Sequence, residues 1–447
     1  MELDLLIQNC DVLTVEVAPE GPQVRFRPGM DIGVQGARVV AVEPTGTLRP
    51  RPATQVISGD RRLAIPGLIN THAHVPMVLF RGLAEDVTIE AWFNDYIWPL
   101  ESNLTPEDVY WGALLGIAEM IEAGITCVAD HYFAMDQVAQ AVVESGIRAN
   151  LVWAVFGHQG PEMLDRTCEF VERWQGQADG RITAWLGPHA PYTCPPDFLR
   201  LAAERARELG VGIHIHVAET REQVQRSLEQ HGRTPIQLLA DTQILERPTL
   251  LAHCLYPQEE DYPLLQAADT GIAHAPKTYL KLGMGTAPLA RFWELDIPVG
   301  LATDGAVSSN TLDILEQLRL MALAQKDAVQ DPTAMPVAQA LAIAFQGSAR
   351  VVHQADALGH LAPGGLADIV LLRQDGVHVT PRHDPGANLI YSARAADVDT
   401  VIVHGRVLLQ EGRLLTIDKA RVQAEVARRL ARLAQRVPGR RIATYPA

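Results

Sequence analysis

Short apolar segments alternate with helix-forming segments along the middle of the chain, and this alternation limits the fold more than any other feature. We predict eight strands, over residues 63–70, 125–130, 149–156, 182–188, 212–217, 250–253, 271–275 and 299–303. Helices are predicted between them, including 106–123, 135–145, 161–175, 196–209, 221–231 and 310–322. Eight strand–helix repeats predict a closed parallel barrel over residues 66–355.

Both ends of the chain are rich in strand signals instead. Strands are predicted over residues 5–7 and 11–15, parted by a turn near Asn9, and over 31–34, 38–42, 368–372, 400–403 and 406–409. A final helix at about 419–437 is expected on the surface. Alternating apolar and polar residues bounded by turn residues are typical of an antiparallel sheet. We therefore predict one discontinuous β-domain made by residues 1–65 and 356–447.

Composition argues against several classes of partner. The 447 residues carry a net charge of −15, which disfavours nucleic acid and anionic membrane surfaces but leaves an uncharged nucleoside open. No apolar run approaches the ~20 residues of a membrane span, and the N-terminus lacks the basic and apolar regions of a signal peptide. Five cysteines without a C-x-x-C pair argue against a disulfide framework. We expect a cytoplasmic protein, with a homo-oligomer left open.

Titratable residues recur where the predicted barrel strands end. The first strand runs into His72-Ala73-His74, and alternate positions on a strand point both imidazoles to the same side. His216 lies in the fifth strand, and Asp304 follows the eighth. Chemistry in such barrels sits at the C-terminal strand ends. Three imidazoles and a carboxylate make a site for one divalent metal ion, with Zn²⁺ the first choice and Fe²⁺ the alternative.

Two further residues are candidates for acid–base work beside that metal. A metal-bound water loses several pKa units and becomes a nucleophile near neutral pH. Glu219 stands three residues beyond His216 and is placed to pass protons to a substrate, while His253 could steer or stabilise the hydroxide. His214 has the strand parity of His216, so a buried structural histidine and a role in the site stay equally open.

The remaining histidines are expected to lie outside the metal site. His131, which follows the second strand, is a weak candidate for supporting a ligand. The others are expected in loops or on the surface: His158, His231, His274, His353, His360, His378, His383 and His404.

Several longer stretches resemble the amidohydrolase superfamily, and within it the 5′-methylthioadenosine/S-adenosylhomocysteine deaminases and related chlorohydrolases. These stretches are PGLINTHAH at 66–74, RGLAED at 81–86, GPHAPY at 187–192, HVAET at 216–220, TDGAVSSN at 303–310 and LAPGGLAD at 361–368. The resemblance covers nearly the whole chain. It implies an α/β fold with a distorted (β/α)8 TIM barrel over 66–355 and a small β-sandwich domain made by both termini, 1–65 and 356–447.

The resemblance also implies roles for individual residues. It gives proton shuttling to Glu219 and activation of the hydroxide to His253 and Asp304, with one metal on His72, His74, His216 and Asp304. It places the substrate among Trp92, Glu101, His189, Glu219 and Ser308. Glu101 would accept hydrogen bonds from the ribose hydroxyls, which a carboxylate can do twice.

Together these features predict a metal-dependent deaminase of adenosine-type nucleosides, most favourably 5′-methylthioadenosine or adenosine, that releases ammonia and the inosine analogue. Relatives that accept S-adenosylhomocysteine carry arginines after the third strand, whereas none occurs here between Trp153 and Arg166. The segment 276–281, PKTYLK, also departs from the commoner Pro-x-Ser-Asn-x-Lys. The alternatives are deamination of guanine, a pterin or cytosine, and triazine dechlorination. A two-metal cyclic amidase is disfavoured because no lysine precedes Lys277.

Overall fold

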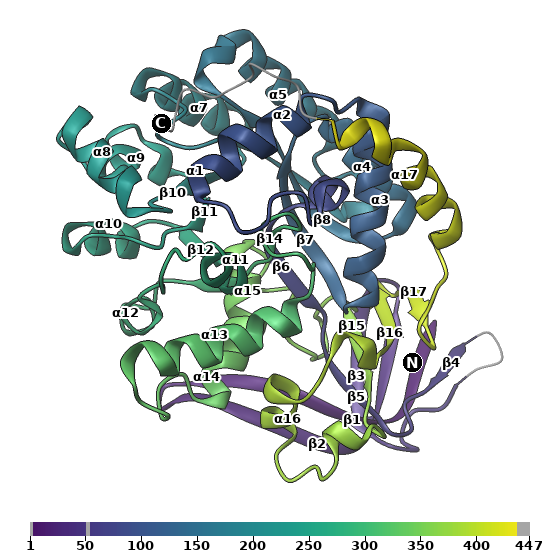
Figure 1. Cartoon of the computed structure of the whole chain (residues 1–447). Coiled ribbons are helices and arrows are strands. Elements are labelled where there is room, and N and C mark those ends of the chain that lie inside the picture. The colour runs from purple at the N-terminus through teal and green to yellow at the C-terminus, as the bar shows by residue number, and fades with distance from the viewer. Residues whose placement is uncertain (1–2, 51–53, 436–447) are drawn as a thin grey trace.

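A computed structural model describes residues 3–50 and 54–435, which form a parallel barrel and a mixed sheet that lie against each other (Figure 1). The barrel strands are β6 (Leu68–His74), β7 (Ile125–Tyr132), β8 (Arg148–Val155), β9 (Ile182–Pro188), β10 (Ile213–Val217), β11 (Thr249–His253), β12 (Thr270–His274), β13 (Val299–Leu301) and β14 (Asp304–Gly305). Their order is β13-β12-β11-β10-β9-β8-β7-β6-β14. Almost every residue of these strands is buried, as expected where helices cover one side and side chains fill the other.

The eighth barrel strand is split, and the split decides how the barrel closes. β13 pairs with β12, and β14, two residues further on, pairs with β6. The gap is bridged by side chains, because Asn70 donates to the Thr303 hydroxyl at 2.7 Å and accepts from the Thr303 amide at 3.0 Å. Asp304 follows with a positive φ of 60°, which turns its side chain at the barrel mouth.

Both termini contribute to the second sheet, in which N-terminal and C-terminal strands lie side by side (Figure 1). Its strands are β1 (Leu5–Ala18), β2 (Gly21–Gln35), β3 (Arg38–Pro44), β4 (Gln55–Ser58), β5 (Arg62–Pro66), β15 (Ile369–Arg373), β16 (Val398–Val403), β17 (Arg406–Gln410) and β18 (Arg413–Leu414). The order is β18-β17-β16-β15-β5-β1-β2-β3, with β4 beside β1. Antiparallel pairing of β5 with β15 joins the two ends of the chain. The predicted α/β fold class is confirmed.

Helices surround the barrel on its outer face and close its mouth. They are α1 (Ile89–Ala91), α2 (Trp98–Glu101), α3 (Pro106–Glu122), α4 (Met135–Ser145), α5 (Gly160–Trp174), α6 (Gln177–Gly180), α7 (Pro196–Leu209), α8 (Arg221–His231), α9 (Pro235–Asp241), α10 (Tyr262–Ala267), α11 (Pro276–Lys281), α12 (Leu289–Glu294), α13 (Ile314–Val329), α14 (Val337–Ala342), α15 (Ser348–Val351), α16 (Pro385–Tyr391) and α17 (Lys419–Leu433). π-Helical turns over Trp92–Ile97 connect α1 to α2. No helix of the described ranges is long and apolar enough to cross a membrane.

Several sequence-based boundaries were wrong, and the structure gives a local or long-range reason for three of them. The predicted strand 63–70 is two strands, and the chain passes from one sheet to the other at Gly67, where a Cβ atom would lie 2.2 Å from Thr126 Oγ1. The turn near Asn9 is a bulge within the single strand β1, with Asn9 at φ 59°. The helix predicted from residue 310 begins at Ile314, because the Asp313 side chain accepts from the backbone of Glu316 and caps it.

The last helix lies on the surface as expected, and one apolar face is buried. α17 runs along α3 in Figure 1, with Val422, Val426 and Leu433 buried. Its predicted last residues, 436 and 437, lie outside the described ranges.

Deeper in the molecule, Arg148 of β8 makes two 3.0 Å hydrogen bonds to Asp368, ahead of β15, and both side chains are 2% exposed. This buried ion pair ties the barrel to the terminal sheet.

Candidate metal centre and active site

The four predicted metal ligands meet at the mouth of the barrel. From β6, His72 Nε2 and His74 Nε2 lie 3.6 and 3.3 Å from Asp304 Oδ1, and Asp304 comes from β14. His216 of β10 places its Nε2 3.4 Å from His74 Nε2. Residues 72 and 304 are far apart in the chain, and the barrel closure between β6 and β14 brings them together.

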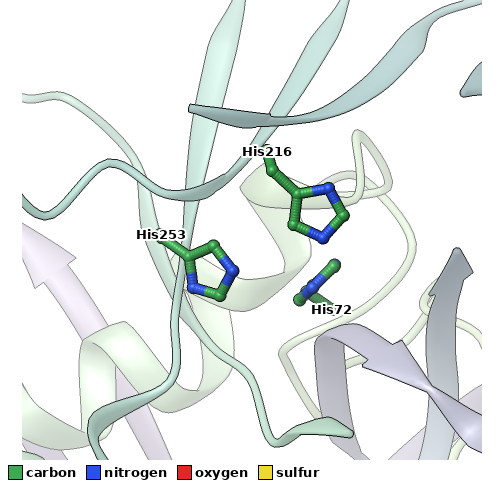
Figure 2. Close-up of side chains that lie close together, drawn as sticks. All are labelled: His72, His216 and His253. Carbon is green, nitrogen blue, oxygen red and sulfur yellow. The ribbon is translucent and has the colours of Figure 1, made fainter. Parts of the chain in front are cut away.

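His253, at the end of β11, belongs to the same cluster. Its ring is 5.4 Å from that of His72 and 5.5 Å from that of His216, and Figure 2 shows the three imidazoles converging. Ligand atoms lie within 4.8 Å of one another in three overlapping groups: His72, His216 and His253; His74, His131 and His216; and His72, His74 and Asp304. His253 has φ 74°, a left-handed backbone that re-aims the side chain where the strand ends.

The charges of the cluster suit a divalent cation. Burial lowers the pKa of His72 to about 3 and that of His216 well below its usual value, so both rings are neutral and carry a free lone pair. Burial opposes ionisation of Asp304 too, but the His72 and His74 rings beside it hold the pKa of that carboxyl well below its usual range. His72 Nε2 is buried without a hydrogen-bond partner. Burial opposes a charge on His74, but Asp304 beside it raises the pKa of that ring to about 9, so a metal ion would take the place of a proton there. Two neutral imidazoles, an ionised carboxylate and an unpartnered nitrogen fit a bound metal ion.

Hydrogen bonds at the far ring nitrogens orient the ligands. His74 Nδ1 lies 2.6 Å from the carbonyl oxygen of His131, and His216 Nδ1 lies 2.8 Å from that of His189. A carbonyl only accepts, so each Nδ1 carries a proton and each Nε2 faces the cluster, where it can bind a metal ion through its lone pair once it carries no proton. His72 Nδ1 is different, since it lies 2.8 Å from Nε2 of His214, which is fully buried.

Glu219 lies beside the cluster with both carboxylate oxygens near polar groups. Its Oε1 is 3.8 Å from His253 Nε2, and its Oε2 accepts from Gln223 Nε2 at 3.2 Å. The Gln223 side chain also accepts from the Glu219 backbone amide at 3.0 Å, which fixes the strand-to-helix turn. The residue is 6% exposed and faces the cavity, so it is placed to exchange protons with a bound molecule.

A cavity of about 660 Å³, measured to its open mouth, rises from the cluster. The predicted substrate residues all line it: Trp92, Glu101, His189, Glu219 and Ser308. Tyr132 donates to Glu101 Oε1 at 2.6 Å, and burial raises the pKa of Glu101 to about 7 although this bond lowers it. Ser308 is buried, and its hydroxyl donates to Asp304 Oδ2 at 2.9 Å, so it supports the carboxylate as well as lining the wall.

The apolar wall of the cavity is aromatic. Phe156 stacks on His189 with ring centroids 4.6 Å apart, and Phe133 stacks on Phe156 at 6.0 Å. Trp98 meets Phe156 edge to face at 5.2 Å. Trp98 and Glu101 are three residues apart on α2, which puts them on the same face of that helix. The described residues that line the cavity include no lysine or arginine.

Sequence reasoning missed several residues of this region. His274 was expected in a loop or on the surface, but it is buried at the end of β12, and burial lowers its pKa to about 3. Tyr132 ends β7 and is also buried, next to His131, the weak supporting candidate, whose ring lies 4.9 Å from that of His216. In each case the signal was a polar residue that closes an apolar strand. The other seven histidines expected outside the site are exposed or partly exposed: His158, His231, His353, His360, His378, His383 and His404.

The unusual segment 276–281 is α11, and it supports the site from behind. The hydroxyl of Tyr279 accepts from the Ala275 amide at 3.1 Å, and its ring meets that of His253 at 5.8 Å. Thr278 Oγ1 lies 3.0 Å from the Ser308 hydroxyl. Lys281 pairs with Glu85 at 2.7 Å. Thr278 and Lys281 hold the loop that follows β14, and Tyr279 supports His253, while none of the three lines the cavity.

The barrel, its terminal sheet and the histidine cluster can be compared with those of known proteins. A model of the amidohydrolase family matches residues 63–408. The chain belongs to the amidohydrolase family. This membership confirms the resemblance drawn from the sequence motifs.

Close relatives and solved structures cover nearly the whole chain. A 5-methylthioadenosine/S-adenosylhomocysteine deaminase of Pelotomaculum thermopropionicum is 42% identical over 437 residues, which is 97% of this chain and 99% of that protein. A zinc-bound adenosine deaminase from Xanthomonas campestris matches with a TM-score of 0.91 at 29% identity, covering 97% and 99% of the two chains. A zinc-bound atrazine chlorohydrolase from Arthrobacter aurescens matches at 0.86 and 27% identity, covering 95% and 100%.

Proposed function

We propose that this amidohydrolase is a zinc-dependent deaminase that acts on adenosine-type nucleosides with an uncharged group at the 5′ position, such as 5′-methylthioadenosine and adenosine. The observation that carries the proposal is that overlapping groups of possible metal ligands, which together include His72, His74, His216 and Asp304, lie beside Glu219 at the floor of an aromatic cavity. The 42% identity to a nucleoside deaminase over nearly the full length supports it.

The floor of the cavity supplies the groups that hydrolytic deamination needs. Zinc, held by the three histidines and Asp304, would lower the pKa of a water molecule and supply the nucleophile. Water adds to the amine-bearing carbon while Glu219 takes a proton and delivers it to the adjacent ring nitrogen. The hydroxyl group added to that carbon then loses its proton, which Glu219 or Asp304 passes to the amino group; the carbon–nitrogen bond breaks and ammonia leaves. His253, 3.8 Å from Glu219, orients the water and the carboxylate.

The middle of the cavity suits a ribose. Glu101 offers a carboxylate held by the Tyr132 hydroxyl, and one carboxylate can accept hydrogen bonds from two neighbouring hydroxyl groups. Trp92, buried at the start of the π-helical turns, lines the same wall and has an indole nitrogen without a hydrogen-bond partner. His189 lies between these groups and the metal cluster, with its ring 4.8 Å from that of His216.

The outer wall favours an uncharged 5′ group. Glu101, the proposed ribose-binding residue, lies on the same helical face as Trp98. The 5′ substituent of the substrate would therefore contact Trp98, Phe133 and Phe156. A carboxylate tail placed there finds no lysine or arginine among the described lining residues. Arg148 cannot serve, because it is buried in its pair with Asp368. Contact with aromatic rings stabilises a bound methylthio group, whereas the desolvation of an unpaired carboxylate weakens binding.

The test is ammonia release from a substrate panel. It compares 5′-methylthioadenosine, adenosine, 5′-deoxyadenosine, S-adenosylhomocysteine, guanine and cytosine. 5′-Butylthioadenosine is the matched control, because its tail is about as long as that of S-adenosylhomocysteine and carries no charge. We expect kcat/KM for the butylthio compound to exceed that for S-adenosylhomocysteine at least ~10-fold, about 1.4 kcal/mol in the barrier.

The outcomes separate the parts of the proposal. Equal kcat/KM for the butylthio compound and S-adenosylhomocysteine would remove the preference for an uncharged tail but leave the deaminase. Ammonia from guanine or cytosine alone would reject the adenine ring. A chlorotriazine belongs in the panel because the chain shares its fold with atrazine chlorohydrolase, and chloride release without ammonia release would assign that reaction instead.

A further inference from the structure

We propose that His214 is a positioning residue that holds His72 in the tautomer able to bind the metal ion. The inference concerns the metal centre and does not depend on which substrate the enzyme takes. His214 and His216 are alternate residues of β10, so both point into the barrel. His216 reaches the cluster at the mouth, and His214 lies one layer below it on the strand, with its ring 4.9 Å from that of His72.

His72 lacks the backbone acceptor that the other two histidines have. His74 and His216 each place Nδ1 on a carbonyl oxygen, at 2.6 and 2.8 Å. A carbonyl oxygen cannot donate a hydrogen bond, so the neutral rings of His74 and His216 must carry their proton on Nδ1. His72 Nδ1 instead meets Nε2 of His214 at 2.8 Å, and an imidazole nitrogen can either donate or accept.

Only one of the two proton arrangements allows a metal to bind. If His214 donates, the proton of neutral His72 stays on Nε2, which faces Asp304 and would be blocked for coordination. If His72 donates, its Nε2 lone pair is free, and His214 must accept through Nε2 and carry its own proton on Nδ1. His214 Nδ1 is buried and has no hydrogen-bond partner among the described residues. The metal-binding arrangement therefore requires the accepting nitrogen of His214.

The experiment measures zinc affinity directly, by competition with a chromophoric chelator. His214→Leu fills the space and offers no acceptor. His214→Gln places an amide oxygen about where histidine Nε2 lies, and His214→Asn carries the same amide one methylene shorter. Partners of metal-bound histidines are worth about 10- to 100-fold in metal affinity. We expect losses of that size for the leucine and asparagine variants, and most of the affinity to be kept by the glutamine variant.

A control variant separates positioning from packing. His274→Leu removes another buried barrel histidine, at the end of β12, whose described ring contact is Tyr279 rather than a ligand. We expect its zinc affinity to match that of the unaltered chain. Thermal unfolding of the metal-free proteins identifies any variant that does not fold.

Two results would overturn the proposal. One is unaltered zinc affinity in a folded His214→Leu variant. The other is equal loss in the glutamine and asparagine variants, since these two amides differ only in reach and the comparison holds even if the leucine variant fails to fold. An adenosine-deaminating enzyme that passes or fails this test remains a deaminase, so the inference and the proposed activity stand or fall separately.

Discussion

Replacing Glu219 by glutamine removes a proton acceptor while it keeps the shape of the site. The glutamine carbonyl can take the place of Oε2 and accept from Gln223, whose Nε2 lies 3.2 Å away. Its amide then occupies the position of Oε1, 3.8 Å from His253 Nε2, and faces the cavity. The fold loses at most one hydrogen bond of net value about 1 kcal/mol. The chemistry loses the group that carries the proton to the substrate ring.

The expected loss follows from the value of a positioned acid–base group. Such groups contribute about 10²- to 10⁴-fold to the rate, which at 1.36 kcal/mol per tenfold corresponds to about 2.7 to 5.4 kcal/mol of barrier. We expect the Glu219→Gln substitution to lower kcat for 5′-methylthioadenosine by a factor in this range. Zinc content should stay at one per chain, because Glu219 is not one of the four predicted ligands.

Ammonia release and metal analysis on the same preparation test this expectation. Glu222→Gln is the matched control, since Glu222 lies in the first turn of α8, is exposed, and is outside the cavity. Its kcat should equal that of the unaltered enzyme. Turnover by Glu219→Gln within about threefold of normal, far short of the acid–base range, would refute the assignment. So would a loss of zinc equal to the loss of turnover, because the residue would then be acting on the metal.

Two more variants test the ribose site and the joint between the sheets. Tyr132→Phe removes the 2.6 Å hydrogen bond to Glu101. A hydrogen bond to a charged group is worth about 1.5–3 kcal/mol, so we expect kcat/KM for 5′-methylthioadenosine to fall about 10- to 100-fold with zinc content unchanged. A kcat/KM equal to that of the unaltered enzyme would mean that Glu101 needs no support. Arg148→Met leaves Asp368 buried and unpaired, which should cost about 3–5 kcal/mol in urea-induced unfolding. Adding Asp368→Leu should recover part of that loss, and a single-variant cost below about 1 kcal/mol would contradict the role of the ion pair.

Local sequence patterns determined more of the active site than of the fold boundaries. His72 and His74 could be placed together because alternate strand residues share a face, which depends only on neighbours in the chain. The helix over residues 196–209 was predicted at both ends, since Pro196 starts it and Gly210, in the left-handed region, ends it. The strand predicted over residues 63–70 could not be divided at Gly67 from sequence, because its two halves are equally apolar and differ only in the strands they pair with.

The sequence by itself determined the residue types and local periods: eight apolar strands, polar residues at their ends, and a donor set suited to a divalent metal. Only the tertiary structure decided that His274 is buried, that Ser308 supports Asp304, and that His214 lies under His72. The physical reason is that barrel closure sets residues such as Asn70 and Thr303, 233 positions apart, at hydrogen-bond distance. Contacts of that kind depend on which strands pair, and the periodicity of apolar residues along the chain does not reveal that pairing.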